Sequence, residues 1–242
     1  MNKKTSSLSK KILKINELLI QKYGIPYRPQ NSPSPIDLLI ATILSQNTND
    51  RNSYKAFTNL KNNYNSWDEI AKLPVKKIES EIKIAGLGKQ KSFTIKNLLN
   101  TLIKKNNEIS LSYITEKNDE EIIHALTDFP GIGLKTASCV LLFSLKRNVC
   151  PVDTHVHRTS NRIGIAESNT PDKTYVLINN NLPENIAHSF HTNLIRLGRE
   201  ICKPANPLCG NCPLNKICKF KNKNYSSTGR NIEKNFMLLD NV

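Results

Sequence analysis

The most informative stretch of the chain is Leu126-Thr-Asp-Phe-Pro130-Gly-Ile-Gly133-Leu-Lys135-Thr-Ala137-Ser-Cys-Val140. Apolar residues ahead of Pro130 follow helical spacing, and a second helix is expected to begin at Leu134. Glycines at 131 and 133 permit backbone conformations closed to other residues and let a ligand approach the backbone. Ile132 lies between them and is expected to anchor the turn. The stretch therefore predicts two helices joined by a tight turn, a helix-hairpin-helix.

The turn also predicts a binding site for an anion. The start of the second helix offers unpaired N–H groups and a partial positive charge. We expect Gly131, Ile132 and Gly133 to grip a DNA phosphate, although such a turn can also be purely structural. Lys and Arg number 35 against 20 Asp and Glu, which gives a net charge of +15. That excess favours a polyanionic partner, with solubilising charge as the simpler alternative.

Composition and periodicity place the chain among all-α proteins. Hydrophobic residues make up 38% of the 242 residues, too many for a disordered chain. The longest apolar run, 139–143, is far shorter than the roughly 20 residues of a membrane span. Helix-start signals recur, as in Ser34-Pro35-Ile36-Asp37 and Asn118-Asp119-Glu120-Glu121, and no strand pattern competes with them.

The first residues favour an intracellular protein. The segment 1–23 lacks the apolar stretch and the cleavage site of an export signal. Its apolar residues are spaced instead as in an amphipathic helix: Leu8, Ile12, Ile15 and Leu19. We therefore expect a reducing compartment, in which disulfide bonds are not the first interpretation of the six cysteines.

Lys135 and Asp153 are candidates for chemistry. Lys135 lies in the first turn of its helix, where a cation opposes the helix dipole, and a residue that breaks a local rule is a candidate for function. A second phosphate contact is the alternative. Asp153, in Cys150-Pro-Val-Asp153, can simply cap the next helix.

If the fold brings this pair together, it suits attack on a sugar. A lysine amine attacks C1′ only when neutral, and at a pKa of about 10.4 only ~0.1% is neutral near pH 7.4. A helix N-terminus, nearby cations and partial burial all lower that pKa. An opposed carboxylate can accept a proton and stabilise positive charge on the sugar.

Four cysteines predict a metal site. Cys202, Cys209, Cys212 and Cys218 follow a C-x6-C-x2-C-x5-C pattern. Zinc usually takes two C-x2-4-C pairs, and only one is present. An iron–sulfur cluster accepts more irregular spacing and is favoured, with zinc and no metal as alternatives. Cys139 and Cys150 are expected to be core residues.

Taken together, these motifs closely resemble the endonuclease III family of DNA glycosylases. The resemblance runs from about Leu8 to Phe220. It implies a two-lobed all-α fold. One lobe, 31–145, would be a six-helix barrel ending in the hairpin at about 119–145. The other, 1–30 with 146–220, would carry a [4Fe-4S] cluster, and 221–242 would form a flexible basic tail.

The resemblance also implies roles for single residues. Lys135 matches the Schiff-base nucleophile of the family, Asp153 its essential carboxylate, and the four cysteines its cluster ligands. Leu87 lies where relatives insert a wedge opposite the lesion. Asn47 stands where a gap-filling glutamine is usual, so either Gln46 fills the gap in a shifted register or the shorter Asn47 does. His155 and Arg158 are further expected DNA contacts.

The implied activity is base excision repair. An oxidised pyrimidine would be flipped out of duplex DNA and removed, and the abasic site nicked by β-elimination, making the enzyme a DNA glycosylase and abasic-site lyase. The expected partner is duplex DNA with damaged bases or abasic sites, bound by a monomer in a prokaryotic cytoplasm or nucleoid, or in a eukaryotic nucleus or mitochondrion. Alternatives are a monofunctional mismatch or adenine glycosylase and a non-catalytic DNA-binding protein with a structural metal.

Overall fold

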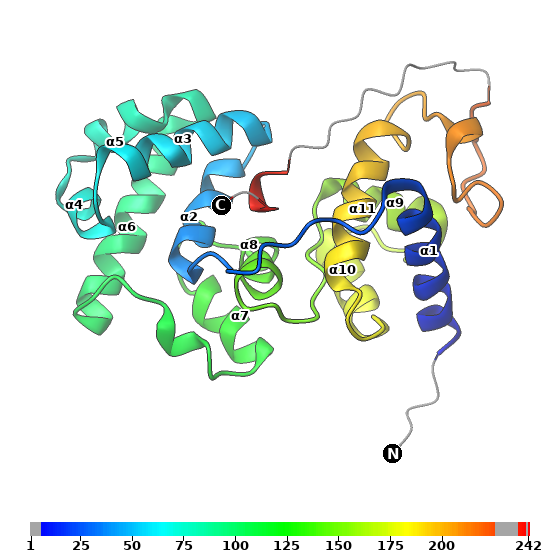
Figure 1. Cartoon of the computed structure of the whole chain (residues 1–242), viewed down its shortest axis with the longest axis horizontal. Helices are drawn as coiled ribbons and strands as arrows, with labels where there is room; N and C mark the ends of the chain where they lie inside the picture. Colours follow the sequence, from blue (N-terminus) through cyan, green and yellow to red (C-terminus); the bar gives the residue numbers. More distant parts are fainter. Residues whose placement is uncertain (1–5, 226–236, 241) are drawn as a thin grey trace. The chain divides into compact units, whose positions relative to one another are not determined.

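The computed structural model describes residues 6–225, 237–240 and 242. Every regular element in these residues is helical, so the predicted all-α class is confirmed (Figure 1). None of their helices is both long and apolar enough to span a bilayer. The α-helices are α1 (Ser7–Tyr23), α2 (Pro35–Ser45), α3 (Asp50–Asn63), α4 (Trp67–Lys72), α5 (Val75–Ile82), α6 (Gly88–Asn106), α7 (Asp119–Thr127), α8 (Leu134–Cys139), α9 (Thr154–Ile163), α10 (Pro171–Asn179) and α11 (Ala187–Glu200).

The predicted helix starts are confirmed by their capping bonds. The Ser34 hydroxyl accepts from the Asp37 amide at the start of α2, and Pro35 is the first helical residue. Asn118 forms a complete capping box with Glu121 at the start of α7. These bonds satisfy N–H groups that the first turn of a helix leaves unpaired, so short local signals fix where the helices begin.

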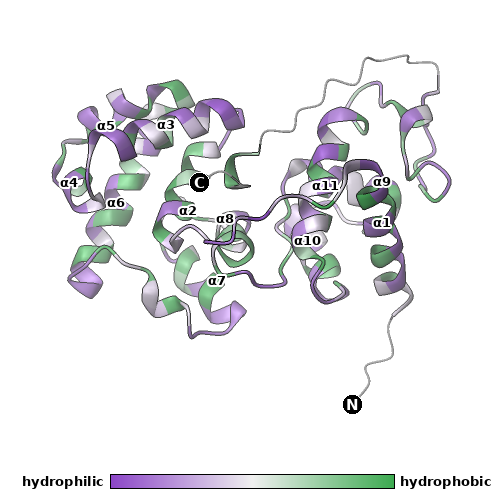
Figure 2. Cartoon of the chain, viewed as in Figure 1, coloured by the Kyte–Doolittle hydropathy of each residue, from purple (hydrophilic) through white to green (hydrophobic). Residues whose placement is uncertain are grey.

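The chain divides into two compact units. The hairpin unit comprises Arg28–Lys146 with Phe236–Val242, and the cysteine unit comprises Met1–Tyr27 with Arg147–Asn235. Both units contain amphipathic helices, and Figure 2 shows hydrophobic and hydrophilic residues alternating along helices such as α6 and α11. Each unit therefore has a core of its own.

The hairpin unit is built around α2. Eight residues of this helix, Ile36 and Leu38–Leu44, are buried, and Asp37 between them is more exposed. A helix that is apolar on nearly all sides must be covered on all sides. It contacts α3, α6, α8 and the π-helical turn Val140–Ser144 that continues α8. Cys139, at the end of α8, is fully buried, as predicted.

The cysteine unit is built around α11. This helix packs against α1 and α9, and α9 in turn contacts α10. Phe190 and Leu194 are fully buried on α11, and Ile12, Ile15 and Leu19 of α1 are equally buried, as their spacing predicted. Cys150, also predicted to lie in the core, is fully buried. The four-cysteine segment follows directly after α11.

The end of the chain differs from the expected basic tail. Met237 and Leu238 are buried, and a 3₁₀ turn, Leu238–Asp240, contacts α2 and α3 of the hairpin unit. The physical reason is the apolar run Met237-Leu-Leu239, which gains more from burial than from solvent. The remainder of the expected tail, 226–236 and 241, lies outside the described residues.

Candidate active site and DNA-contact residues

The hairpin turn is fixed by its own backbone. Gly131 has a φ of 85°, in the left-handed region that favours glycine. A Cβ added there would lie 3.0 Å from Cγ2 of Thr94 on α6. The amide of Ile132 donates to the carbonyl of Phe129 at 3.0 Å, and the Ile132 side chain is buried. The turn thus has the predicted anchor and one glycine that cannot be replaced without strain.

Gly133 differs from Gly131 in what surrounds it. It caps the start of α8 in an extended conformation, and a Cβ added there would meet no atom within 4 Å. Gly133 is exposed. Open space beside a backbone at a helix start leaves room for a ligand to approach the amides. Lys135 follows in the first turn of α8 and is half-buried.

The loop after α2 contains the two residues considered for gap filling, and their side chains differ in what they contact. The Gln46 amide Nε2 donates to the Gly131 carbonyl at 3.4 Å, so this side chain is engaged with the hairpin. Asn47 is exposed and has a φ of 52°, a conformation that asparagine tolerates better than most residues. Of the two side chains, that of Asn47 is the more accessible to a ligand.

Leu87 is presented in a strained conformation. Its φ is 50°, and it follows Gly86, which also has positive φ. The left-handed region costs a residue with a Cβ about 1–2 kcal/mol. The Leu87 side chain is nevertheless 49% exposed, so burial does not compensate for this cost. Strain of this kind at an exposed apolar residue points to a functional role.

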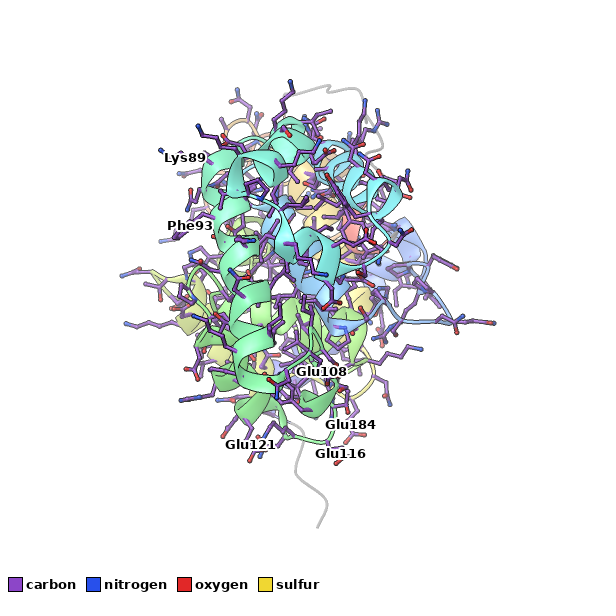
Figure 3. All side chains as sticks on the ribbon, turned by 90° about the vertical axis from the view of Figure 1, so that its left-hand side faces the viewer. Lys89, Phe93, Glu108, Glu116, Glu121 and Glu184 are labelled. Carbon is purple, nitrogen blue, oxygen red and sulfur yellow. The ribbon has the colours of Figure 1, made fainter. Side chains whose placement is uncertain are left out.

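Leu87 borders an open hollow at the start of α6. The hollow has a volume of ≈ 610 Å³ and is lined by Val75, Glu79, Leu87, Gly88, Lys89, Gln90 and Phe93. Figure 3 shows Lys89 and Phe93 projecting outward from the same side of α6. Phe93 is 58% exposed. An exposed aromatic ring and a cation beside Leu87 suit contact with a polyanion that carries flat bases.

Sequence reasoning missed Phe93 and also Lys91 on the same helix. Nothing in the local pattern of Phe93 distinguishes it from a core residue. For Lys91 a signal was available, because Lys91, Ile95, Leu98 and Leu102 have the spacing of one helix face and the last three are apolar. A lysine in such a row is a candidate for burial, and Lys91 is 2% exposed.

Asp153 has the capping role that its position allowed. Its Oδ1 accepts from the Val156 amide at 2.8 Å at the start of α9. The side chain is half-buried, so it keeps some access to solvent. A cap uses only one carboxylate oxygen, which leaves the second available for another task.

His155 and Arg158 interact with each other and with α11. One Arg158 nitrogen donates to the Gly198 carbonyl at 2.9 Å and lies 3.3 Å from Nδ1 of His155, while Nε donates to the Cys202 carbonyl at 3.1 Å. The pKa of His155 is lowered, first by burial and further by the Arg158 and Arg199 cations, against the opposing charge of Asp153. The shift favours the neutral form of His155. Arg158 has a visible structural role, and its contact with DNA stays a prediction.

The four cysteines line a single cavity. Cys202, Cys209, Cys212 and Cys218 share it with apolar side chains such as Leu197, Ile201 and Pro207. Burial raises the pKa of the Cys212 thiol to about 12, and the other three cysteines add to this shift. Burial also raises the pKa of Cys202, against the opposing effect of Arg162 and Arg158. Within the described residues, no group of three or more His, Cys, Asp and Glu side chains has the arrangement of a metal-ion site.

Arg162 holds the loop that bears these cysteines. Its two terminal nitrogens donate to the carbonyls of Lys203 and Pro204 at 2.7 and 2.8 Å. One of them also lies 3.5 Å from Sγ of Cys202, and the guanidinium stacks 4.4 Å from the centre of the Phe220 ring. In the other direction, Sγ of Cys218 donates to the Arg162 carbonyl at 3.3 Å. A loop whose regular structure is one 3₁₀ turn, Cys209–Asn211, thus gains partners for its backbone from α9.

Comparison with known proteins agrees with this geometry. The HhH-GPD superfamily of base excision DNA repair proteins matches residues 40–184. Endonuclease III of Thermotoga maritima is 35% identical over 204 residues, which cover 84% of this chain and 92% of the relative. A protein of Arabidopsis thaliana named as a DNA glycosylase is 36% identical over 78% of this chain, which spans 62% of the plant protein.

A solved structure gives the same result. The chain superposes on endonuclease III from a non-covalent complex with DNA, with a TM-score of 0.74 and 26% identity over 87% of this chain and 95% of the other. Both the sequence match and the fold therefore support the same assignment. The chain belongs to the endonuclease III family, within the HhH-GPD superfamily of base excision DNA repair proteins.

Proposed function

We propose that the protein removes oxidised pyrimidines from duplex DNA and then cuts the strand at the abasic site, with Lys135 as nucleophile and Asp153 as its carboxylate partner. Membership of the endonuclease III family makes the chain a base excision repair glycosylase with abasic-site lyase activity. The observation that carries the residue assignment is the placement of a half-buried lysine in the first turn after the glycine turn of the hairpin.

The chemistry follows from a neutral lysine amine. The Lys135 nitrogen forms a bond to C1′ while the bond from C1′ to the base breaks, and the base leaves with a proton. Loss of a proton from nitrogen and opening of the sugar ring give an imine. Removal of a C2′ proton then expels the 3′ phosphate by β-elimination, and water releases the enzyme. Asp153 would accept a proton and stabilise the developing positive charge.

Three segments of the hairpin unit and one residue of the cysteine unit would contact DNA in this proposal. The turn formed by Gly131, Ile132 and Gly133 would bind the phosphate backbone. Leu87 would enter the duplex where the flipped base has left the stack. We assign the gap opposite the lesion to Asn47, because Gln46 is engaged with the Gly131 carbonyl. His155, in the cysteine unit, would donate a hydrogen bond to the backbone as a neutral side chain.

The four cysteines would hold a [4Fe-4S] cluster. Four thiols that line one apolar cavity match the thiolate ligand set of such a cluster. When bound, the cluster would supply a rigid, charged centre that orders the loop. The chain's own Lys203, Lys216 and Lys219 would then be held ready to contact phosphate. A purified protein that is yellow-brown and contains iron would support this assignment, whereas a colourless zinc protein would reject it.

Replacement of the nucleophile tests the proposal directly. We expect Lys135→Gln to lower base excision and nicking on the order of 10³-fold or more, because the proposed imine forms through the Lys135 amine. Borohydride should trap the wild-type protein on abasic-site DNA and should not trap the variant. Lys173→Gln, which removes one exposed positive charge on α10, serves as the matched control. Undiminished trapping of Lys135→Gln would reject the assignment.

Two variants at Asp153 separate its capping role from its proposed chemical role. Asparagine can accept the same hydrogen bond from Val156, so Asp153→Asn should keep the stability and lose roughly 10²–10⁴-fold in rate. Asp153→Ala should in addition lose about 1 kcal/mol of unfolding free energy, the usual value of a cap. Single-turnover kinetics and urea unfolding measure the two effects. A fully active Asp153→Asn protein would leave Asp153 as a cap alone.

A further inference from the structure

Lys91 is a buried cation whose hydrogen bonds go to backbone carbonyls. Its Nζ donates to the carbonyl of Leu44 at 2.7 Å and to that of Ala85 at 2.8 Å. The side chain is 2% exposed, and burial lowers its pKa to about 8. Desolvation of an ammonium group is costly, so a lysine in this position needs a strong compensating interaction. Two carbonyls at the ends of helical segments provide it.

The two carbonyls belong to the segments that lead into the predicted DNA-contact loops. Leu44 lies in the last turn of α2, and Gln46 and Asn47 follow it directly. Ala85 ends the 3₁₀ turn 83–85, and Gly86 and Leu87 follow it. The two loops are about forty positions apart in sequence, yet a single ammonium group joins the backbone just ahead of both.

Both loops carry a residue in the left-handed region. The φ values of Asn47 and Leu87 are 52° and 50°. Asparagine tolerates this region, whereas leucine stays in it only where the surrounding structure holds it there. Fixing the carbonyl of Leu44 limits how the backbone can leave α2, and fixing that of Ala85 limits how it can enter α6. Lys91 thus bonds to the backbone just ahead of both left-handed residues, of which Leu87 is the strained one.

We propose that Lys91 is a positioning residue that holds the loop of Gln46 and Asn47 and the loop of Leu87 in fixed register, so that both enter the duplex together. This inference rests on the proposed function, because it assigns these loops to the opened base pair. Lys91 does not touch the reacting atoms. It acts on the wedge and the gap-filling side chain by fixing the backbone that carries them.

A second lysine on α6 offers a matched control. Nζ of Lys96 donates to the carbonyls of Ala71 and Leu73, at the end of α4, the second at 2.8 Å. Lys96 therefore has the same bonding pattern as Lys91, two carbonyls at the end of a helical segment. Neither of its partners precedes a predicted DNA-contact loop. Loss of Lys96 should reproduce the structural effect of losing Lys91 without the effect on DNA.

The test compares Lys91→Met with Lys96→Met in the full chain. The substrates are a duplex with one oxidised pyrimidine and the same duplex with a preformed abasic site, with 2-aminopurine in the opposite strand to report unstacking. We expect Lys91→Met to lower base excision at least about tenfold and to lose the unstacking signal. Cleavage of the abasic site should fall less, because no base has to be displaced there.

Lys96→Met should change both rates by less than about threefold. In a Leu87→Ala background the effect of Lys91→Met should shrink, because the wedge through which Lys91 acts is already missing. If Lys91→Met does not fold, Lys91→Gln, which keeps an uncharged donor group, provides the same comparison. Equal loss on the two substrates, or equal effects of the Lys91 and Lys96 variants, would overturn the proposal.

The unstacking signal does not depend on bond cleavage, so it tests the role of Lys91 separately from the proposed function. Wild-type protein that unstacks the duplex without excising the base would contradict the proposed function. The role of Lys91 would then be decided by the unstacking signal alone, which Lys91→Met should lose and Lys96→Met should keep. Wild-type protein that excises the base, with a Lys91→Met variant that unstacks the duplex normally, would contradict only the role of Lys91.

Discussion

The backbones of the hairpin and of the cysteine loop differ in where their hydrogen-bond partners lie in the sequence. In the hairpin, α7 is capped by its own Asn118 and Glu121, and the turn closes through a bond between Ile132 and Phe129. In the cysteine loop, carbonyls of Cys202, Lys203 and Pro204 are satisfied by two arginines of α9, some forty positions earlier in the sequence. The hairpin is held mainly by bonds between residues a few positions apart, whereas these carbonyls of the cysteine loop depend on distant side chains.

This difference predicts that the two regions tolerate change differently. Each buried or half-buried carbonyl needs a donor, and a loop without repeating backbone bonds must take its donors from elsewhere. Replacing Arg162 of α9 therefore removes several hydrogen bonds to the cysteine loop at once. In the hairpin, the sensitive positions are instead single backbone conformations, such as that of Gly131.

The largest effect is expected from a cysteine ligand. Cys209→Ser should lose the iron and lower the free energy of unfolding of the loop on the order of 5 kcal/mol, because the binding energy of a structural metal is also folding energy. DNA affinity should fall before the chemical step does. Cys139→Ala, at a buried cysteine outside the loop, should keep its iron. A folded Cys209→Ser protein that lacks iron and binds DNA fully would show that the cluster does not order the loop.

Removal of the Arg162 side chain tests the dependence on distant donors. Arg162→Met leaves the carbonyls of Lys203 and Pro204 without their donor and should cost about 2 kcal/mol. Arg162→Lys, with one donor group in place of the guanidinium fork, should recover part of this loss. Hydrogen exchange of residues 202–218 locates the effect. Unchanged protection in the methionine variant would mean that the loop is specified by its own sequence after all.

The smallest effects are expected within the hairpin, and two glycines separate stability from binding. Gly131→Ala should cost about 1–2 kcal/mol, because its φ is 85° and a Cβ would approach Thr94. Gly133→Ala has open space and an extended backbone, so its stability should change by less than about 0.5 kcal/mol. If DNA approaches this backbone, Gly133→Ala should still weaken binding. Equal DNA affinity of the wild type and Gly133→Ala would contradict a close approach at this position.

Local patterns were enough to predict the helices and the hairpin. The caps at Ser34 and Asn118 and the anchor at Ile132 depend on residues a few positions apart, and the burial of Cys139 and Cys150 was predicted from their local sequence context. The tail was predicted less well, because the burial of Met237 and Leu238 requires the surface of α2 and α3. The placement of Arg158 at backbone carbonyls was equally invisible, since its partners lie on and after α11.

The sequence by itself determined the helical class, the glycine turn with its lysine, and a cysteine spacing that suits a cluster. These are encoded in neighbouring residues, because capping, helix periodicity and turn conformation act over a few positions. Only the tertiary structure decided which carbonyls Lys91 and Arg162 satisfy, and that Leu87 is exposed in a strained conformation. A long cationic side chain can reach any carbonyl within its length, so its partner is chosen by packing and not by its neighbours in the chain.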